Sequence, residues 1–94
     1  MQEQSIEQSS PNQFQVKIDY NGLVKHLSIS SHERVQSVLE RAENEFQITQ
    51  NRHTLALFNA SGVEVADTQS VKEAGIKPGD ELLLRPSRIK GGNR

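Results

Sequence analysis

The residues best suited to chemistry lie near the end of the chain, where Gly91 and Gly92 follow Arg88-Ile89-Lys90. Glycine has no Cβ, so a glycine pair lets an extended backbone pass through a narrow channel that other residues would resist. Four of the eleven Lys and Arg residues fall in the last ten positions, which hold no acid. Taken alone, a glycine pair is a weak signal, and the basic run can be simply a soluble tail.

No other group of side chains has the spacing of a catalytic or metal site. The chain has no cysteine, which excludes a thiolate zinc site and a cysteine nucleophile. The histidines lack the spacing of a zinc motif and are interpreted as surface residues: His26, His32 and His53. The acids of the expected helix alternate with arginines and are interpreted as a solvated face: Glu33, Glu40, Glu43 and Glu45. We expect no catalytic residue, no metal and no cofactor in the chain itself.

Size and charge narrow the class of protein further. With 94 residues the chain can build one small core but cannot enclose a deep catalytic pocket. Eleven basic and twelve acidic residues give a net charge of −1, which provides no field to attract nucleic acid or an anionic membrane. The longest apolar run, Leu82 to Leu84, is too short to span a bilayer, and the start lacks the features of a signal peptide. We expect a cytoplasmic protein that is not an enzyme.

The elements that would position the tail begin after residue 13. Residues 1–13 are rich in Gln and Ser and are predicted to be a disordered arm, either a solubilising leader or a docking arm. From Phe14 to Tyr20 apolar and polar side chains alternate, which is the period of a half-buried strand. Asn21-Gly22 suits a two-residue type I′ turn, so residues 23–29 are predicted to return as the second strand of a hairpin.

One amphipathic helix of about four turns is expected next. Ser30 and Ser31 offer an N-cap, with Glu33 in capping-box spacing after Ser30. Apolar residues then recur at intervals of three and four: Val35, Val38, Leu39, Ala42 and Phe46. The end of the helix is expected between residues 44 and 47.

The second half of the chain is predicted to complete a sheet. Residues 54–58, 63–65 and 81–85 suit strands, and residues 67–76 suit a short helical turn. The long connection before the last strand favours parallel pairing beside the first strand. We therefore predict an α+β fold, a β-grasp, in which residues 14–86 form a mixed curled sheet packed on one amphipathic helix and residues 87–94 form a flexible tail.

This arrangement resembles the ubiquitin-like modifiers, the family of ubiquitin and SUMO, over residues 14–92. The matching segments share the family's order and spacing: Phe14-Gln15-Val16-Lys17-Ile18, the helix led by Ser31, Leu55-Ala56-Leu57-Phe58, Ser70-Val71-Lys72-Glu73-Ala74-Gly75-Ile76 and Gly79-Asp80-Glu81-Leu82. The tail Arg88-Ile89-Lys90-Gly91-Gly92 is similar to the basic, aliphatic, double-glycine terminus of ubiquitin. The N-terminal arm is closer to SUMO.

The resemblance implies a protein modifier that is joined to target amines through an isopeptide bond at the Gly92 carboxylate. An activating enzyme, which uses ATP, would recognise Arg88, Ile89, Lys90 and Gly91, because a guanidinium can bind a carboxylate through two hydrogen bonds. A conjugating enzyme and target proteins would follow. Since Asn93 and Arg94 come after Gly92, the resemblance also implies a precursor cut between Gly92 and Asn93. The peptidase would be a cysteine protease or, for a bacterial member of the family, a JAB-type zinc metallopeptidase.

The departures from ubiquitin concern its apolar receptor-binding patch. Here the first turn is the tight Asn21-Gly22, the outward position on the third strand is Ala56, and the last-strand position is near Arg85. We therefore expect ordinary ubiquitin receptors to bind poorly. Pro86 removes a backbone donor and is expected to end sheet pairing and free the tail.

Two other functions remain open. A sulfur carrier of the same fold would bear a thiocarboxylate at Gly92, although such carriers usually end directly in Gly-Gly. Alternatively, the chain is a ubiquitin-like binding module whose tail is never processed.

Overall fold

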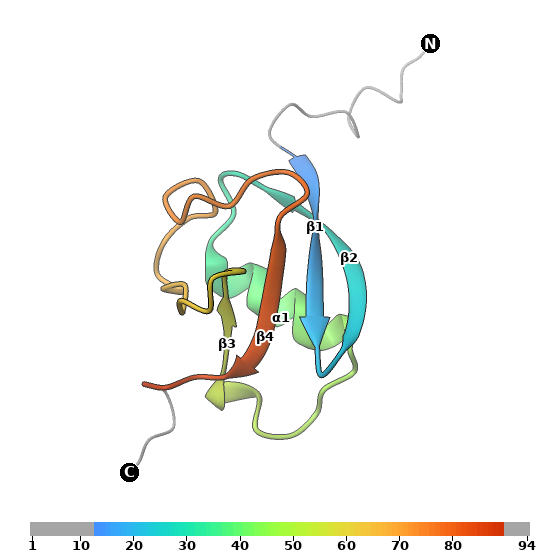
Figure 1. Cartoon of the computed structure of the whole chain (residues 1–94). Helices are drawn as coiled ribbons and strands as arrows, with labels where there is room; N and C mark the ends of the chain where they lie inside the picture. The colour runs from blue at the N-terminus through green and yellow to red at the C-terminus, as the bar shows by residue number, and fades with distance from the viewer. Residues whose placement is uncertain (1–12, 90–94) are drawn as a thin grey trace.

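The first two strands form the hairpin that the alternation predicts (Figure 1). The computed structural model describes residues 13–89, in which β1 (Gln13–Tyr20) runs antiparallel to β2 (Leu23–Ser30). Asn21 and Gly22 take φ values of 54° and 88°, the two positive values that a tight type I′ turn requires. The predicted strand, turn and returning strand are confirmed, and each strand is one residue longer than expected.

The helix α1 (Val35–Glu45) begins later than the serine pair predicts. Ser30 and Glu33 do interact, with the Ser30 N–H donating to a Glu33 carboxylate oxygen at 3.2 Å, but this contact closes a turn ahead of the helix. The Val35 N–H donates to the Gln69 carbonyl at 2.8 Å, so a distant loop satisfies part of the first turn. The predicted serine N-cap is wrong for this reason. The helix has about three turns rather than four, and it ends within the predicted range.

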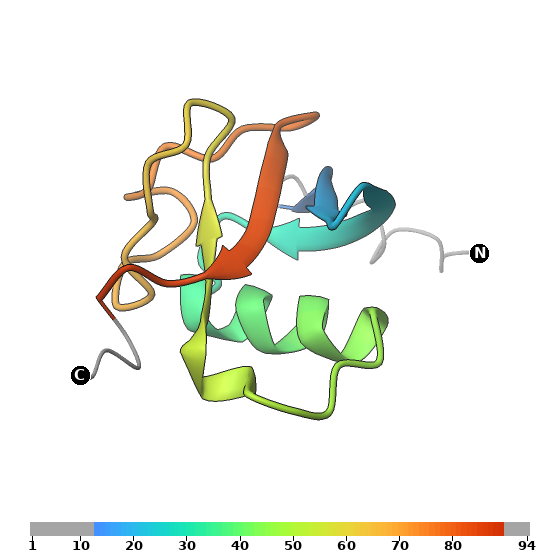
Figure 2. The ribbon, with the colours of Figure 1, turned by 60° about the horizontal axis from the view of Figure 1, so that its bottom comes forward.

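The sheet is completed by β3 (Leu55–Phe58) and β4 (Glu81–Pro86). Within residues 13–89 the strand order is β2-β1-β4-β3, with β4 parallel to β1 and antiparallel to β3. The helix crosses one face of this sheet (Figure 2). The predicted α+β β-grasp, including parallel pairing of its first and last strands, is confirmed.

Residues 63–65 do not form the strand that was predicted. They are held to the edge of β3 by an isolated bridge between Phe58 and Glu64. The Asn59 side chain accepts the Val63 N–H at 3.0 Å, and the Asn59 N–H donates back to the Val63 carbonyl at 2.9 Å. Because these bonds close a turn immediately after β3, too little of the returning segment is left for a ladder.

Ser70 and Glu73 form a capping box, whereas the sequence predicted one at Ser30 and Glu33. The Ser70 N–H donates to the Glu73 carboxylate at 2.9 Å, and the Glu73 N–H donates to the Ser70 hydroxyl at 3.1 Å. The Ala74 N–H donates to the Ser70 carbonyl at 2.9 Å. The short helical turn predicted within residues 67–76 is therefore present.

Buried apolar side chains from both layers form one core cluster between the sheet and the helix. The strands supply Val16, Ile18, Leu27, Ile29, Leu55, Leu57, Leu82 and Leu84. The helix and the loops supply Val35, Val38, Leu39, Ala42, Val65, Val71 and Ile76. Burial of this apolar surface is the main term that stabilises the fold.

A polar network at the start of the helix links α1 to the hairpin. The Glu33 carboxylate accepts hydrogen bonds from the Ser37 hydroxyl at 2.8 Å and from an Arg41 guanidinium nitrogen at 2.7 Å, and Arg41 also donates to the Ser28 carbonyl of β2. Burial alone raises the pKa of the Glu33 carboxyl. The hydrogen bonds from Arg41, Ser37 and the Ser30 amide, with the charge of Arg41, outweigh burial and hold this pKa below its ordinary value.

Candidate functional site

Two of the predicted site residues lie within the described part of the chain. Arg88 and Ile89 follow β4 after one intervening residue, Ser87, and both are exposed, with 81% of Ile89 accessible to solvent. The remaining predicted site residues lie outside residues 13–89: Lys90, Gly91, Gly92 and Asn93. Their roles in recognition, processing and conjugation stay predictions.

The root of the tail is held to the fold beyond Pro86. Pro86 is the last residue of β4 and pairs with Leu55, so the sheet ends at the proline as predicted. However, the Ser87 N–H donates to the Thr54 carbonyl at 2.7 Å, which continues the contact with the start of β3 by one residue. The expectation that Pro86 frees the tail is wrong for Ser87, which supplies the donor that proline lacks, whereas residues 90–94 lie outside the described part of the chain.

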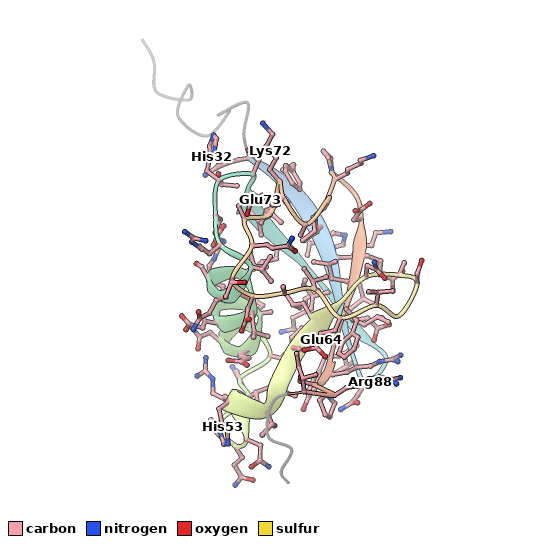
Figure 3. The ribbon with its side chains drawn as sticks, turned by 90° about the vertical axis from the view of Figure 1, so that its left-hand side faces the viewer. His32, His53, Glu64, Lys72, Glu73 and Arg88 are labelled. Atoms are coloured by element: carbon pink, nitrogen blue, oxygen red, sulfur yellow. The ribbon has the colours of Figure 1, made fainter. Side chains whose placement is uncertain are left out.

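Glu64 fixes the next part of the tail. One Glu64 carboxylate oxygen accepts the Ser87 hydroxyl at 2.7 Å, and the other accepts the Arg88 N–H at 3.1 Å. The Ile89 N–H then donates to the Ser87 hydroxyl oxygen at 3.0 Å. Figure 3 shows Glu64 and Arg88 side by side next to β3. We call the contacts of Glu64 with Ser87 and Arg88 the Glu64 clamp.

The backbone around Glu64 is itself anchored on β3. Glu64 forms the isolated bridge with Phe58, and the N–H of the next residue, Val65, donates to the Leu57 carbonyl at 2.8 Å. Val65 is buried, whereas the Glu64 side chain is half-buried and reaches the tail. A carboxylate on an anchored backbone can hold two donors at fixed positions, and hydrogen bonds to a charged acceptor are stronger than neutral ones.

A second polar feature lies between α1 and the short 3₁₀ helix Arg52–Thr54. Glu43 is only 3% exposed, so its interpretation as part of a solvated helix face is wrong. Arg52 pairs with one Glu43 carboxylate oxygen at 3.0 Å and also donates to the Asn44 side chain at 2.9 Å. Glu43 turns inward because Arg52, nine residues further along the chain, reaches back over the end of the helix.

A groove beside this pair is lined in part by His53, which is exposed. His26 and His32 are exposed too, on β2 and in the turn before α1, so the prediction that all three are surface residues is confirmed. Among residues 13–89, no three His, Asp or Glu side chains gather in a way that could hold a metal ion. None of the helices described is long and apolar enough to cross a membrane.

Sequence reasoning missed both Glu64 and Glu43 as structurally special residues. Each acts through a partner brought close only by the fold, Ser87 and Arg88 for Glu64 and Arg52 for Glu43. Neither pair has a spacing that marks it along the chain. Glu43 sits one position after the buried Ala42, and this is the one local sign that it lies at the border of the apolar stripe.

No protein-family model and no curated protein matches the chain, but solved structures do. A designed protein based on ubiquitin superposes with a TM-score of 0.73 at 18% identity, covering 89% of this chain and 100% of that one. Caldiarchaeum subterraneum ubiquitin gives 0.68 at 20% identity, with 85% and 99% covered. The ubiquitin-like domain of an Arabidopsis thaliana protein gives 0.66 at 18% identity, with 83% and 81% covered.

The chain has the ubiquitin-like β-grasp fold. At identities of 20% and below, the likeness concerns the fold alone. These ubiquitin-like structures include both ubiquitin itself and a domain named only as ubiquitin-like, so the fold is compatible with a modifier and with a binding module.

On the sheet face that points away from the helix, the side chains of β3 are less exposed than the sequence led us to expect. Ala56 and Phe58 lie on that face by strand alternation, but they are only 1% and 5% exposed. Ala56 therefore faces away from the helix as predicted, but it is buried and adds no exposed surface to this face. Arg85, which pairs with Ala56, is exposed. Weak binding of ordinary ubiquitin receptors stays a prediction.

Proposed function

We propose that the chain is a ubiquitin-like protein modifier that is cleaved after Gly92, activated at the new carboxylate and joined to target amines through an isopeptide bond. Its partners in this role are an activating enzyme that consumes ATP, a conjugating enzyme, target proteins and a JAB-type or cysteine peptidase. Arg88, Ile89, Lys90 and Gly91 would be read by the activating enzyme. The domain supplies no catalytic group and acts as the substrate of these enzymes.

The observation that carries this proposal is the position of the tail on a ubiquitin-like fold. The last strand, β4, leads into Arg88 and Ile89, whose exposed side chains immediately precede Lys90-Gly91-Gly92. A basic side chain and an aliphatic side chain are thus presented to solvent just ahead of the glycine pair. Such a pair can enter a narrow active site because neither residue has a Cβ.

Intact-mass analysis of the protein recovered from its native host tests the proposal. We expect a product that ends at Gly92, together with larger adducts on other proteins. Gly92→Ala is expected to abolish the adducts, because a Cβ at the reacting residue obstructs the channel. Arg94→Ala serves as the matched control, since it changes the tail beyond the cleavage site and leaves Gly92 in place.

A chain truncated after Gly92 separates processing from conjugation. If cleavage only exposes the carboxylate, the truncated chain forms the same adducts without the peptidase. An intact chain without adducts would refute the modifier and favour a binding module. Exchange of one oxygen for sulfur at the Gly92 terminus, without adducts, would instead identify a sulfur carrier.

A further inference from the structure

The Glu64 clamp occupies the groups that a bound peptide strand would use. The Arg88 N–H donates to Glu64, and the Ile89 N–H donates to the Ser87 hydroxyl, which itself donates to Glu64. Two successive backbone donors of the tail are therefore satisfied within the domain. Residues 88 and 89 form a bend rather than a continuation of β4.

A tail that enters another protein in extended form must give up these contacts. Extended peptides are commonly bound through their own backbone N–H and C=O groups, as an added strand. The bend at residues 88 and 89 and the inward bonds of their N–H groups are incompatible with that mode of binding. Release from Glu64 therefore has to precede uptake of this part of the tail.

The clamp also determines how far the tail reaches. With the clamp closed, the four residues 89–92 extend beyond the last residue that Glu64 holds, a reach of about 13 Å. With the clamp open, Ser87 is still held by its N–H bond to the Thr54 carbonyl, so the five residues from Arg88 to Gly92 become available and their fully extended length is about 17 Å. One side chain thus sets the length of chain that can be drawn into a deep channel.

We infer that Glu64 is a positioning residue, which holds Ser87 and Arg88 against the domain and must release them before an enzyme can act at Gly92. The nature of that enzyme rests on the proposed function, whereas the clamp itself does not. Glu64 touches neither Gly92 nor a reacting atom in this scheme. It acts only through Ser87 and Arg88.

Cleavage by trypsin reports the release directly. Trypsin cuts after Arg88 when the surrounding residues are extended, and the proline after Arg85 protects the neighbouring bond. When opening and closing are fast relative to cleavage, the rate follows the population of the open tail. Glu64→Ala is expected to speed cleavage of the Arg88–Ile89 bond about tenfold, because it removes two hydrogen bonds to a charged acceptor.

Amide hydrogen exchange provides a second measurement on the same full-length chain. In Glu64→Ala the Arg88 and Ile89 amides should exchange about tenfold faster, with no change at core amides of β1 and β4. Glu64→Gln should stay nearer to the unsubstituted protein, because the amide oxygen still accepts the Arg88 N–H. Rescue by this conservative variant distinguishes the clamp from a loss of loop structure.

Glu81→Ala is the matched control. Glu81 is an exposed acid at the start of β4, so this variant changes the net charge by the same amount without touching the tail. Its trypsin cleavage and amide exchange should equal those of the unsubstituted protein. Urea unfolding of each variant verifies that the domain remains folded.

Unchanged cleavage and exchange in Glu64→Ala would overturn the inference. If both rise, processing in a lysate of the native host is measured next, and a lower KM with an unchanged kcat is expected for removal of residues beyond Gly92. If trypsin and exchange respond but no processing occurs with any variant, the clamp stands and the proposed modifier function fails. If processing occurs but is slower in Glu64→Ala, the enzyme uses the clamped tail, and the required release is refuted.

Discussion

Removing the Arg52 guanidinium is expected to destabilise the domain through the carboxylate that it leaves behind. The Glu43 side chain is 4% exposed, and one of its oxygens is paired with Arg52 at 3.0 Å. The other oxygen has no hydrogen-bond partner within the described chain. Arg52→Ala therefore leaves a buried carboxylate without its cation. An uncompensated buried charge strongly destabilises the folded state.

The expected loss is about 2–3 kcal/mol of unfolding free energy. Breaking a fully buried ion pair by removing one partner costs about 3–5 kcal/mol. The Arg52 side chain is 38% exposed, so water can enter the vacated space and solvate Glu43 in part, which reduces the cost. In a domain of this size, such a loss lowers the melting temperature by roughly 8–24 °C.

Urea unfolding and thermal unfolding measure this loss directly. Arg85→Ala is the matched control, because Arg85 is an exposed arginine on β4 and its removal should change stability by less than about 0.5 kcal/mol. Arg52→Lys should fall between the two, since an ammonium keeps the charge but cannot bond Glu43 and Asn44 together in the same geometry.

The double variant Arg52→Ala/Glu43→Gln tests the cause. If the buried charge is responsible, the neutral amide recovers about 1 kcal/mol or more of what Arg52→Ala loses. The reasoning is refuted if Arg52→Ala is as mild as Arg85→Ala. It is also refuted if Glu43→Gln adds to the loss, because the damage would then come from packing of the arginine stem rather than from the carboxylate.

Three further predictions concern local features of the fold. The Glu33 pKa is lowered, so its contribution to stability is present above its ordinary value near 4.5 and is lost as the pH falls through the folded-state pKa; Glu33→Gln should weaken the acid dependence of urea unfolding, and an identical dependence would contradict the network. Ser70→Ala removes a capping-box hydroxyl and should cost about 1 kcal/mol by urea unfolding, whereas no loss would show that the Glu73 contact contributes nothing. Gly22→Ala should cost about 1–2 kcal/mol because φ is 88°, although a Cβ would meet no atom within 4 Å; an unchanged melting temperature would exclude this conformational cost.

Local patterns predicted the elements correctly where the deciding interaction is also local. Alternation from Phe14 and the Asn21-Gly22 pair specified the hairpin, because both the strand period and the turn conformation depend on adjacent residues. The start of the helix was predicted wrongly because the Gln69 carbonyl accepts the Val35 N–H. That carbonyl comes from a loop more than thirty residues away and leaves no trace at the serines.

In the candidate site, too, local features could be predicted from the sequence, and features that depend on distant contacts could not. The exposed positions of Arg88 and Ile89 follow from their place after the last strand, which the sequence locates. The Glu64 clamp could not be predicted from the sequence. Glu64 precedes Ser87 by 23 positions and Arg88 by 24, and the turn after β3 is what brings them close together. The burial of Glu43 depends similarly on the path of the chain from the end of α1 to Arg52.

The parallel pairing of β1 with β4 has a consequence for how the chain acquires its structure. The two central strands of the sheet are the first and the last strand of the domain, β1 and β4, and Ile18 of β1 lies opposite Leu82 of β4. A nascent chain that ends before residue 81 can close the hairpin and wind the helix, but it leaves β1 and β3 without the strand that joins them. Folding of the sheet must therefore wait for β4. Pairing β4 with β1 closes a long loop of chain, and such non-local pairing slows the folding rate. Until β4 pairs with β3, Ser87 and Arg88 are not held beside Glu64, so the clamp forms only when folding is complete.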